Sequence, residues 1–358
     1  MYGEALRLLI PSACNNTYLN TGTLGPSPTP VMAAVEAAET QWVHSGPGHT
    51  PLFHAARDQA EIFGSRLETA FPGGRIALTE NNSAALLRIL WGIRFKARDE
   101  IIVTNHEHGA LLMSVGTLAK RFRLKVHVIS VEDPVGISTQ VEKLMNDRTR
   151  LVAMSHVSYL TGWRLPVEKV SRITERYKYC RLLVDGAQAL GNIPVNFSLT
   201  GADYYVFCGY KWMMAPTGLA GVWVRDGRMA ELATVWPNER DYSVENLASG
   251  HFKTTPESGQ SLEYGTRIWT RVVGWALMWD YFEEEGFIHQ STYQQRLANE
   301  AIQRISAECP EISVRVPPNL DTGMTALTAL QCLSMGEKLA PELWRRKIFV
   351  KPLPQGIR

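Results

Sequence analysis

The sequence predicts an α/β fold with a mainly parallel sheet, and two observations lead to it. Short, continuous apolar runs at 182–184 and 204–207 are typical of strands that are covered on both faces. Apolar residues at helical spacing, clearest at 84–93, mark helices between such runs. Because consecutive parallel strands need a crossover connection, usually a helix, this alternation favours a sheet with helices packed on it.

The elements can be placed in chain order. A Gly/Pro-rich loop begins near Tyr18 and leads into an alanine-rich helix at 30–43. Strands and helices then alternate as far as Val224, with a crossover helix at 168–179 before the strand that ends at Asp185. Beyond them we expect a polar, irregular segment over the site, then two helices and two strands, at 236–259, 268–285, 293–308, 312–316 and 325–330.

Composition limits the classes of function. The chain has 358 residues, of which 45% are hydrophobic and 20% charged, enough for one large or two moderate domains. A net charge of +2 argues against a nucleic-acid partner, and the lack of an apolar run of about 18 residues argues against a membrane span. The five cysteines are scattered, without metal-ligand spacing or an even disulfide set, so we expect a cytoplasmic enzyme with reduced thiols.

Two strand ends carry the residues with the clearest chemistry. Asp185 follows the run at 182–184 directly, and Lys211 lies just beyond the run at 204–207. Open α/β sheets bind ligands at the carboxyl ends of their strands, which favours a site at this edge. From the spacing alone, a structural salt bridge between the two residues is the simpler interpretation.

The start of helix 84–93 is a second signal. Asn82 and Ser83 stand where backbone N–H groups and the positive end of the helix dipole form an anion site, and Ser83 adds a hydroxyl. A plain N-cap is the alternative, because Asn and Ser are preferred at that position in any case.

Two histidines near a glutamate raise the question of a metal site. His106 and His108 flank Glu107 at the exit of the strand that begins near Glu100. Two histidines and one acid are a thin ligand set, and no distant Cys/His cluster completes it. We therefore expect no metal.

A set of motifs resembles a known family. Asp185 and Gln188 form an Asp-x-Ala-Gln pattern, Lys211 follows in a Gly-Tyr-Lys-Trp setting, and a small-residue turn occupies 215–218. Together they resemble the class V aminotransferase family of fold type I pyridoxal phosphate (PLP) enzymes, which includes cysteine desulfurases. The sequences of these motifs are most similar to those of cystine C-S lyases and isopenicillin N epimerase-like members.

The resemblance implies an architecture. It covers the chain from about Tyr18 to about Thr266 and resumes weakly near the C-terminus. A mixed, mainly parallel seven-stranded sheet is then expected in a large PLP-binding domain over 18–279. Residues 1–17 and 280–358 are expected to form a small α+β domain.

The family's motifs also imply roles for single residues. Lys211 would hold PLP as a Schiff base and shuttle the Cα proton of the substrate. Asp185 would keep the pyridine nitrogen protonated, and His108 would stack on the ring, which leaves His106 as a bystander. The remaining cofactor contacts would come from Asn82, Ser83, Ser158, Gln188, Cys208, Tyr210 and Thr266.

Thr266 and Cys208 differ from the other predicted contacts. Family members use the residue at Thr266 to reach the phosphate in the neighbouring subunit, which implies a homodimer with shared sites. Cys208 stands where relatives carry Ser or Thr and is a weaker hydrogen-bond donor. A turn that starts the next helix is an alternative explanation for Gly265 and Thr266.

The resemblance also indicates substrate contacts. The loop that contains Thr21, Gly22 and Thr23 lies by the substrate in relatives, and Thr23 is our candidate. Relatives bind the substrate carboxylate through an arginine in a C-terminal Gly-x-Arg strand, and this sequence carries that pattern at 356–358 and ends there. We favour Arg358, and the alternatives are Arg267, Arg345 and Arg346.

Several reactions begin with removal of the Cα proton by Lys211. Desulfurases need a mobile cysteine shortly before the Arg strand, whereas the last cysteine here, Cys332, follows an apolar run. We therefore predict a C-S β-lyase that acts on a sulfur-substituted amino acid, with aminotransferase or amino-acid epimerase as the alternative. An inactive scaffold is disfavoured because Lys211, Asp185, Gln188 and His108 are all retained.

Overall fold

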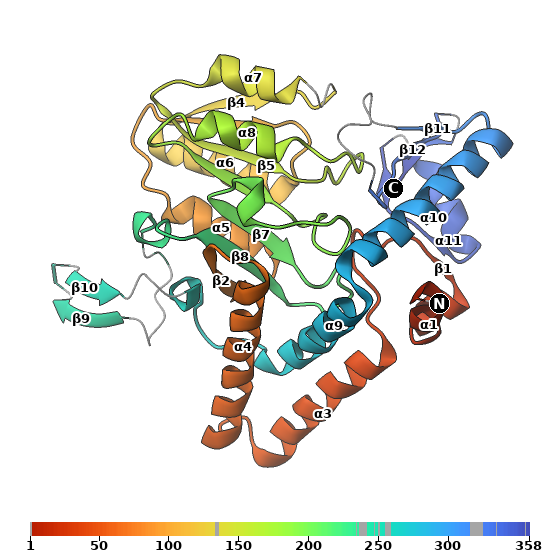
Figure 1. Ribbon diagram of the computed structural model, residues 1–358, viewed down its shortest axis with the longest axis horizontal. Helices are drawn as coiled ribbons and strands as arrows, with labels where there is room; N and C mark the ends of the chain where they lie inside the picture. The colour runs from red at the N-terminus through yellow and green to blue at the C-terminus, as the bar shows by residue number, and fades with distance from the viewer. Residues whose placement is uncertain are drawn as a thin grey trace.

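A seven-stranded sheet forms the centre of the molecule (Figure 1). The computed structural model describes residues 2–132, 136–233, 235, 242–246, 248–249, 251–254, 259–315, 325–333, 335–354 and 356–358. In spatial order, the strands are β2 (Gly74–Thr79), β8 (Ala220–Arg225), β7 (Tyr204–Cys208), β6 (Arg181–Asp185), β5 (Thr149–Ser155), β3 (Glu100–Thr104) and β4 (Lys125–Ile129).

The direction of these strands agrees with the prediction. β8 runs antiparallel to both of its neighbours, β2 and β7. The other neighbouring pairs are parallel. The predicted mixed, mainly parallel seven-stranded sheet is therefore confirmed, and the carboxyl ends of β3, β5, β6 and β7 meet at one edge.

Helices cover both faces of the sheet, as the continuous apolar strands require. On one face, α5 (Asn82–Gly92) and α6 (Gly109–Phe122) bury leucines and valines such as Leu86 and Val115. On the other face lie α4 (Thr50–Ala70), α7 (Ile137–Leu144), α8 (Val167–Thr174) and α9 (Val272–Glu285). In addition, α3 (Thr29–Ser45) packs along α9.

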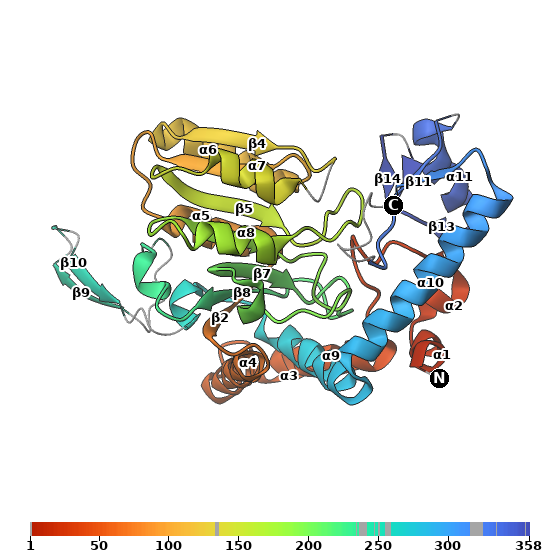
Figure 2. The same cartoon turned by 45° about the horizontal axis from the view of Figure 1, so that its top comes forward.

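A smaller antiparallel sheet stands beside the large one (Figure 2). Its strands, in spatial order, are β11 (Ser313–Val314), β12 (Leu330–Gln331), β15 (Gly356–Ile357) and β14 (Pro352–Leu353). The helices α10 (Phe287–Glu308) and α11 (Leu339–Arg345) accompany it. The N-terminal segment, with α1 (Tyr2–Leu8) and α2 (Pro11–Asn15), joins this part because β1 (Thr17–Tyr18) pairs with β13 (Ile348–Phe349).

Some element boundaries differ from the prediction. The crossover helix ends at Thr174 and continues as turns, so it is shorter than 168–179. The apolar run at 325–330 forms a strand only at its last residue, in β12. The segment expected to be irregular at 236–259 contains a hairpin of β9 (Tyr242–Asn246) and β10 (His251–Thr254), which projects away from the small sheet (Figure 1).

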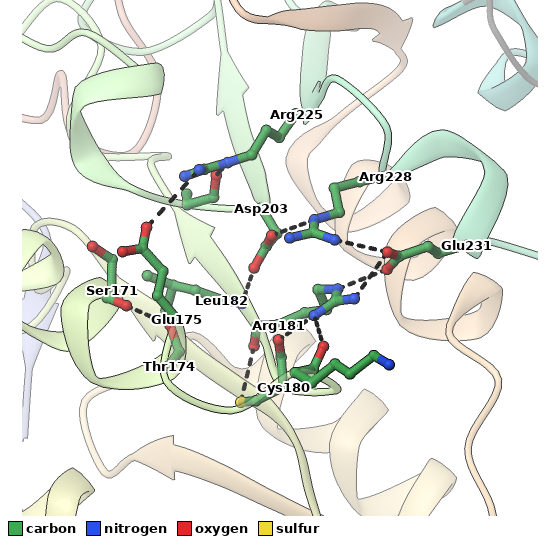
Figure 3. A network of polar contacts seen from close by, with 12 residues as sticks. Ser171, Thr174, Glu175, Cys180, Arg181, Leu182, Asp203, Arg225, Arg228 and Glu231 are labelled. Carbon is green, nitrogen blue, oxygen red and sulfur yellow. Dashed lines mark hydrogen bonds and ion pairs between the residues drawn. The ribbon is translucent and has the colours of Figure 1, made fainter.

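The edge of the large sheet opposite the predicted site is held by an ion-pair network (Figure 3). Asp203 accepts hydrogen bonds from the backbone N–H of Leu182 at 2.9 Å and from Arg228 at 2.7 Å. Glu231 accepts from Arg181 and Arg228. These contacts anchor the amino end of β6, so that its carboxyl end is presented at a defined position.

Among the residues that the structure describes, none of the helices combines the length and the apolar character needed to cross a bilayer.

Candidate active site

Asp185 and Lys211 lie at the carboxyl edge of the large sheet, where their strands predicted them. Asp185 is the last residue of β6 and is only 4% exposed. Its Oδ1 atom accepts hydrogen bonds from Asn82 Nδ2 at 3.0 Å and from the backbone N–H of Ala187 at 2.9 Å. Lys211 follows β7 by three residues, and no hydrogen bond or ion pair holds its Nζ within the described part of the chain. The pair therefore does not form the simple salt bridge that the spacing allowed.

The first turn of α5 gathers hydrogen-bond donors. Asn81, one residue before the helix, caps it by accepting from the backbone N–H of Ala84 at 2.8 Å. That cap leaves Asn82 and the half-buried Ser83 for other contacts. The backbone N–H of Asn82 points to Tyr210 Oη at 3.4 Å, so a tyrosine from the lysine loop meets the start of the helix. This corner has the donors that a phosphate group requires.

Gln188 is held on both sides of its amide. Its Oε1 atom accepts from Trp212 Nε1 at 2.8 Å, and its Nε2 atom donates to the carbonyl of Gly22 at 2.7 Å. One amide N–H of Gln188 is therefore committed to the N-terminal loop, and one remains for a cofactor oxygen. Sequence reasoning missed Trp212 in this role, although the Gly-Tyr-Lys-Trp setting contains it.

The N-terminal loop closes over the lysine segment. The backbone N–H of Gly25 donates to the carbonyl of Tyr210 at 2.8 Å. A Cβ atom at Gly25 would lie 1.9 Å from the carbonyl oxygen of Lys211, and one at Gly22 would lie 3.1 Å from Gln188 Oε1. Glycine is needed at position 25 because the two backbones approach so closely, and at position 22 it leaves room for the side chain of Gln188.

His108 faces several charged groups of the site. Its ring lies edge-on to Tyr159 with the centroids 5.4 Å apart, and its Nδ1 accepts from the backbone N–H of Ala110. Burial lowers the pKa of His108, Asp185 raises it, and nearby cations lower it further. Those cations are Lys211, Lys351 and Arg358, of which sequence reasoning missed Lys351.

Ser158 and His106 form a buried pair. Ser158 is fully buried, and its Oγ lies 3.2 Å from His106 Nδ1. The same Oγ accepts from the backbone N–H groups of Leu160 and Thr161 at 3.3 Å. His106 therefore supports the Ser158 loop. That it takes no part in binding the cofactor stays a prediction.

Arg358 reaches the same region from the small sheet. Its guanidinium donates to the carbonyl of Tyr159 at 2.8 Å and to Thr23 Oγ1 at 3.0 Å. Burial lowers the pKa of Arg358 to about 10, so it is charged at neutral pH. The structure thus brings together the two residues predicted for the substrate, Thr23 and Arg358.

The alternative arginines are engaged elsewhere. Arg267 pairs with Glu263 and donates to the carbonyl of Leu78. Arg345 and Arg346 pair with Glu342 on the exposed side of α11. Arg267 thus lies near the carboxyl end of β2, at the same edge as Asp185, but Glu263 and Leu78 already engage its guanidinium.

Glu107, which the sequence analysis weighed only as a metal ligand, is a buried carboxyl beneath the site. It is 1% exposed, and Ser155 donates to it through both Oγ and the backbone N–H, at 2.6 and 2.9 Å. Thr104 Oγ1 donates to it as well, at 2.5 Å. Burial raises the pKa of Glu107 to about 7, and the nearby charge of Asp185 adds to this. The ends of β3 and β5 are therefore joined by a group that titrates near neutrality.

Of the predicted cofactor residues, Cys208 lies in this cluster and Thr266 does not. Cys208 is buried, donates its thiol to the carbonyl of Ala187 at 3.6 Å and also contacts the side chain of Tyr210. Thr266 is exposed after η3 (Gly259–Leu262). Within the described part of the chain, no group of three His, Cys, Asp or Glu residues is placed to bind a metal ion.

Comparison with protein-family models decides the family. The model described as aminotransferase class V matches residues 75–350. The chain belongs to the class V aminotransferase family. This confirms the predicted membership, and the PLP dependence of the family agrees with the predicted cofactor.

Curated relatives carry the name cysteine desulfurase. A cysteine desulfurase from Haloferax volcanii is 27% identical over 259 residues, which are 70% of this chain and 59% of that protein. A probable cysteine desulfurase from Mycolicibacterium paratuberculosis is 33% identical over 143 residues, 39% of this chain and 21% of that protein. The chain thus spans less than two thirds of the length of these relatives.

Solved structures share the fold. A variant of C-DES with glycine covalently linked to its PLP cofactor has a TM-score of 0.88 and 23% identity, covering 98% of this chain and 93% of that one. An apo cysteine desulfurase from Thermococcus onnurineus NA1 has a TM-score of 0.85 and 24% identity, covering 98% and 87%. A third neighbour is the complex of the cystine C-S lyase C-DES with cysteine persulfide, with a TM-score of 0.86, 23% identity and coverage of 97% and 93%. Membership and these likenesses confirm the predicted fold class.

Proposed function

We propose that this chain is a PLP-dependent C-S β-lyase that acts on a sulfur-substituted amino acid. The proposal rests mainly on the proximity of four side chains at one edge of the sheet: Asp185, Lys211, His108 and Arg358. The names of the relatives, cysteine desulfurase and cystine C-S lyase, support a sulfur-containing amino acid as the substrate class. PLP, when bound, supplies an electron sink for charge that develops at Cα of the amino acid.

The residues present fit such a cofactor. Asp185 Oδ1 is held by Asn82, and no hydrogen bond of its Oδ2 is present within the described residues, so a carboxylate oxygen remains for a ring nitrogen. The buried Oδ1 of Asn82 also has no partner among the described residues. Tyr210, Ser83 and the first turn of α5 supply donors for a phosphate, and Lys211 supplies an amine.

The other roles follow from position. Arg358 and Thr23 would bind the substrate carboxylate, because a charged guanidinium with several N–H groups binds a carboxylate strongly. Lys211 would move the proton at Cα. Loss of that proton and cleavage of the C–S bond release the thiol, and hydrolysis of the remainder yields pyruvate and ammonia.

Cys332 supports elimination over persulfide transfer. Its side chain is 2% exposed in a small apolar cluster with Leu339 and Val350. A thiol buried in this way is poorly placed to attack a substrate sulfur atom.

The wider assignment is part of the same proposal. It includes a homodimer in which Thr266 reaches the neighbouring site, and a cytoplasmic location. It also includes the division into a large domain over 18–279 and a small domain formed by 1–17 and 280–358. The two separate sheets support that division.

The test begins with the site of cofactor attachment. Borohydride reduction of the PLP-loaded protein, followed by peptide mapping, should place the label on Lys211. Lys211→Ala should abolish labelling and activity, whereas the exposed Lys178→Ala should change neither. A label on another lysine contradicts the proposal.

The reaction is tested with S-substituted cysteines. We expect equal amounts of pyruvate and thiol, without need for a keto-acid acceptor. Deuterium incorporation at Cα without pyruvate would reject the lyase in favour of an epimerase. Amine transfer that depends on a keto acid would show that the protein is an aminotransferase and not a lyase.

A further inference from the structure

A cavity of about 720 Å³ lies on the face of the large sheet that carries α4, α8 and α9. Its walls come from the end of α4, the start of α8, the segment 190–200 after β6, and the junction of α9 with α10. None of the residues predicted to bind the cofactor or the substrate lines it. Cavities of this volume are typical of sites for small organic molecules.

The walls of this cavity are mainly apolar and partly aromatic. Phe71, Trp279 and Phe287 line it, and the rings of the last two lie 4.9 Å apart at 54°. Leu199 and Ile288 also line it and are 77% and 70% exposed. An apolar molecule with flat rings would cover these surfaces and would be released from water by doing so.

One buried polar group lies in the wall of the cavity. His156 is 0% exposed and lines it, and its Nε2 atom has no hydrogen-bond partner among the described residues. Glu168 Oε1 lies 4.0 Å from that nitrogen, beyond hydrogen-bond distance, and is engaged by Arg164 at 2.8 Å. A buried N–H or lone pair without a partner costs free energy, which a ligand would recover.

The other nitrogen of His156 indicates what this ligand offers. His156 Nδ1 lies 2.8 Å from Tyr205 Oη, and both groups are fully buried. Burial lowers the pKa of His156 to about 3, so the ring is neutral. Nδ1 is the acceptor that the structure provides for the Tyr205 hydroxyl, so the ring proton belongs on Nε2. Nε2 is then a buried donor without a partner among the described residues, on a side chain that lines the cavity.

The charged groups at the rim favour a neutral ligand. Arg164 is paired with Glu168, and Glu283 accepts from Trp279 Nε1 and from Arg66. These pairs leave no single uncompensated cation to attract an anion. We propose that this cavity binds a neutral, flat, apolar molecule of about two fused rings, whose hydrogen-bond acceptor receives the Nε2–H of His156.

The site lies close behind the candidate active site but is separate from it. The backbone N–H of His156 donates to the carbonyl of Asp185 at 2.9 Å. Because the cavity shares no predicted catalytic residue with that site, binding can be measured on the full chain in the presence of PLP.

The probes are 2-acetylnaphthalene and 2-ethylnaphthalene, which have nearly the same size and differ in one carbonyl acceptor. Isothermal titration calorimetry should show one saturable site for both. The acetyl compound should bind about 3- to 10-fold more tightly, as expected for one additional hydrogen bond. In His156→Phe the two affinities should become equal.

A second variant keeps the test decisive if His156→Phe does not fold. Leu199→Trp adds a large ring at an exposed position of the rim and should weaken both probes about tenfold. Met113→Trp makes the same addition at a 76% exposed residue of α6, on the opposite face, and should leave both affinities unchanged. Absence of saturable binding, equal affinity of the two probes for the native chain, or insensitivity to Leu199→Trp would each overturn the proposal.

Discussion

At the scale of single residues, the site depends on how neighbours orient its ionisable groups. Asp185 is fixed by Asn82 and by a backbone N–H, so that its carboxylate has one orientation. Gln188 is fixed in the same way by Trp212 and Gly22. Such preorganisation makes the charge of a group useful, because no reorganisation is needed when the reaction begins.

Replacement of Asp185 by Asn tests its charge without changing its size. An amide cannot keep a pyridine nitrogen protonated, so turnover should fall on the order of 100-fold or more. Cofactor content, measured by absorbance, should remain. The exposed Asp226→Asn is the matched control and should behave as the native protein. Near-normal turnover of Asp185→Asn would remove this residue from its role.

Glu107 predicts a dependence of stability on pH. Its pKa is raised from 4.5 to about 7, so between these values the folded chain binds more protons than the unfolded chain. The free energy of unfolding therefore loses a contribution as pH rises through this interval, on the order of 1 kcal/mol per pH unit.

The Glu107→Gln variant isolates that contribution. The difference in unfolding free energy between variant and native chain should shift in favour of the variant from pH 5 to pH 8. Denaturant titrations at both pH values measure it. His156 has the opposite sign, since its pKa is lowered, but it cancels in the comparison because both proteins contain it. An unchanged difference would contradict the assigned pKa.

At the scale of elements, the position of Lys211 depends on a loop far away in sequence. β7 brings the lysine to the edge of the sheet. The loop after β1 packs closely against the backbone of Lys211. The amino end of β6 is meanwhile anchored by Asp203 and Arg228 at the opposite edge (Figure 3). The site is thus built from element ends that are held from both sides.

Gly25→Ala tests the contact of this loop with the lysine segment. The added Cβ would overlap the carbonyl of Lys211, so one of the two backbones must move. We expect a loss of about 2 kcal/mol in unfolding free energy and a lower PLP content, measured by denaturation and absorbance. Gly48→Ala is the control, because a Cβ there meets no atom within 4 Å. Equal behaviour of the two variants would show that the contact is unimportant.

At the scale of the whole molecule, the two sheets meet around the candidate site. Arg358 comes from the small sheet and binds Tyr159 and Thr23 from other parts of the chain. Lys351 pairs with Arg358 through the backbone, so both cations are carried by the same hairpin. Displacement of the small sheet would remove both from the site.

The proposed homodimer is tested by mixing inactive chains. If Thr266 serves the neighbouring site, a mixed dimer of Lys211→Ala and Thr266→Ala contains one intact site. Its rate per remaining Lys211 should equal that of the native enzyme, above that of the Thr266→Ala homodimer. A rate equal to that homodimer, or an active monomer in sedimentation, would refute the shared site.

Much of the site could be predicted because it depends on local pattern. The apolar run of β6 ends at Asp185, and the run of β7 leads to Lys211, so their shared edge follows from the direction of parallel strands. The start of α5 was visible in the same way, from helical spacing and capping residues. To predict these features it is enough to know the spacing of apolar residues along the chain and the residue at which that spacing changes.

Other contacts were decided by the tertiary structure alone. Gly25 lies beside Lys211, Gly22 beside Gln188, and Arg358 beside Thr23, although in each pair the residues are far apart in the chain. No local pattern records such distances, because they depend on how the sheets and loops pack.

What the sequence by itself determined was the alternating fold, its family and the residues at the strand ends. What only the tertiary structure decided was that Arg358 lies beside Thr23, which groups are the partners of Gln188, and that Glu107 and His156 are buried. The physical reason is that strands and helices follow from neighbours along the chain. Burial, ion pairing and the pKa of a group follow from neighbours in space.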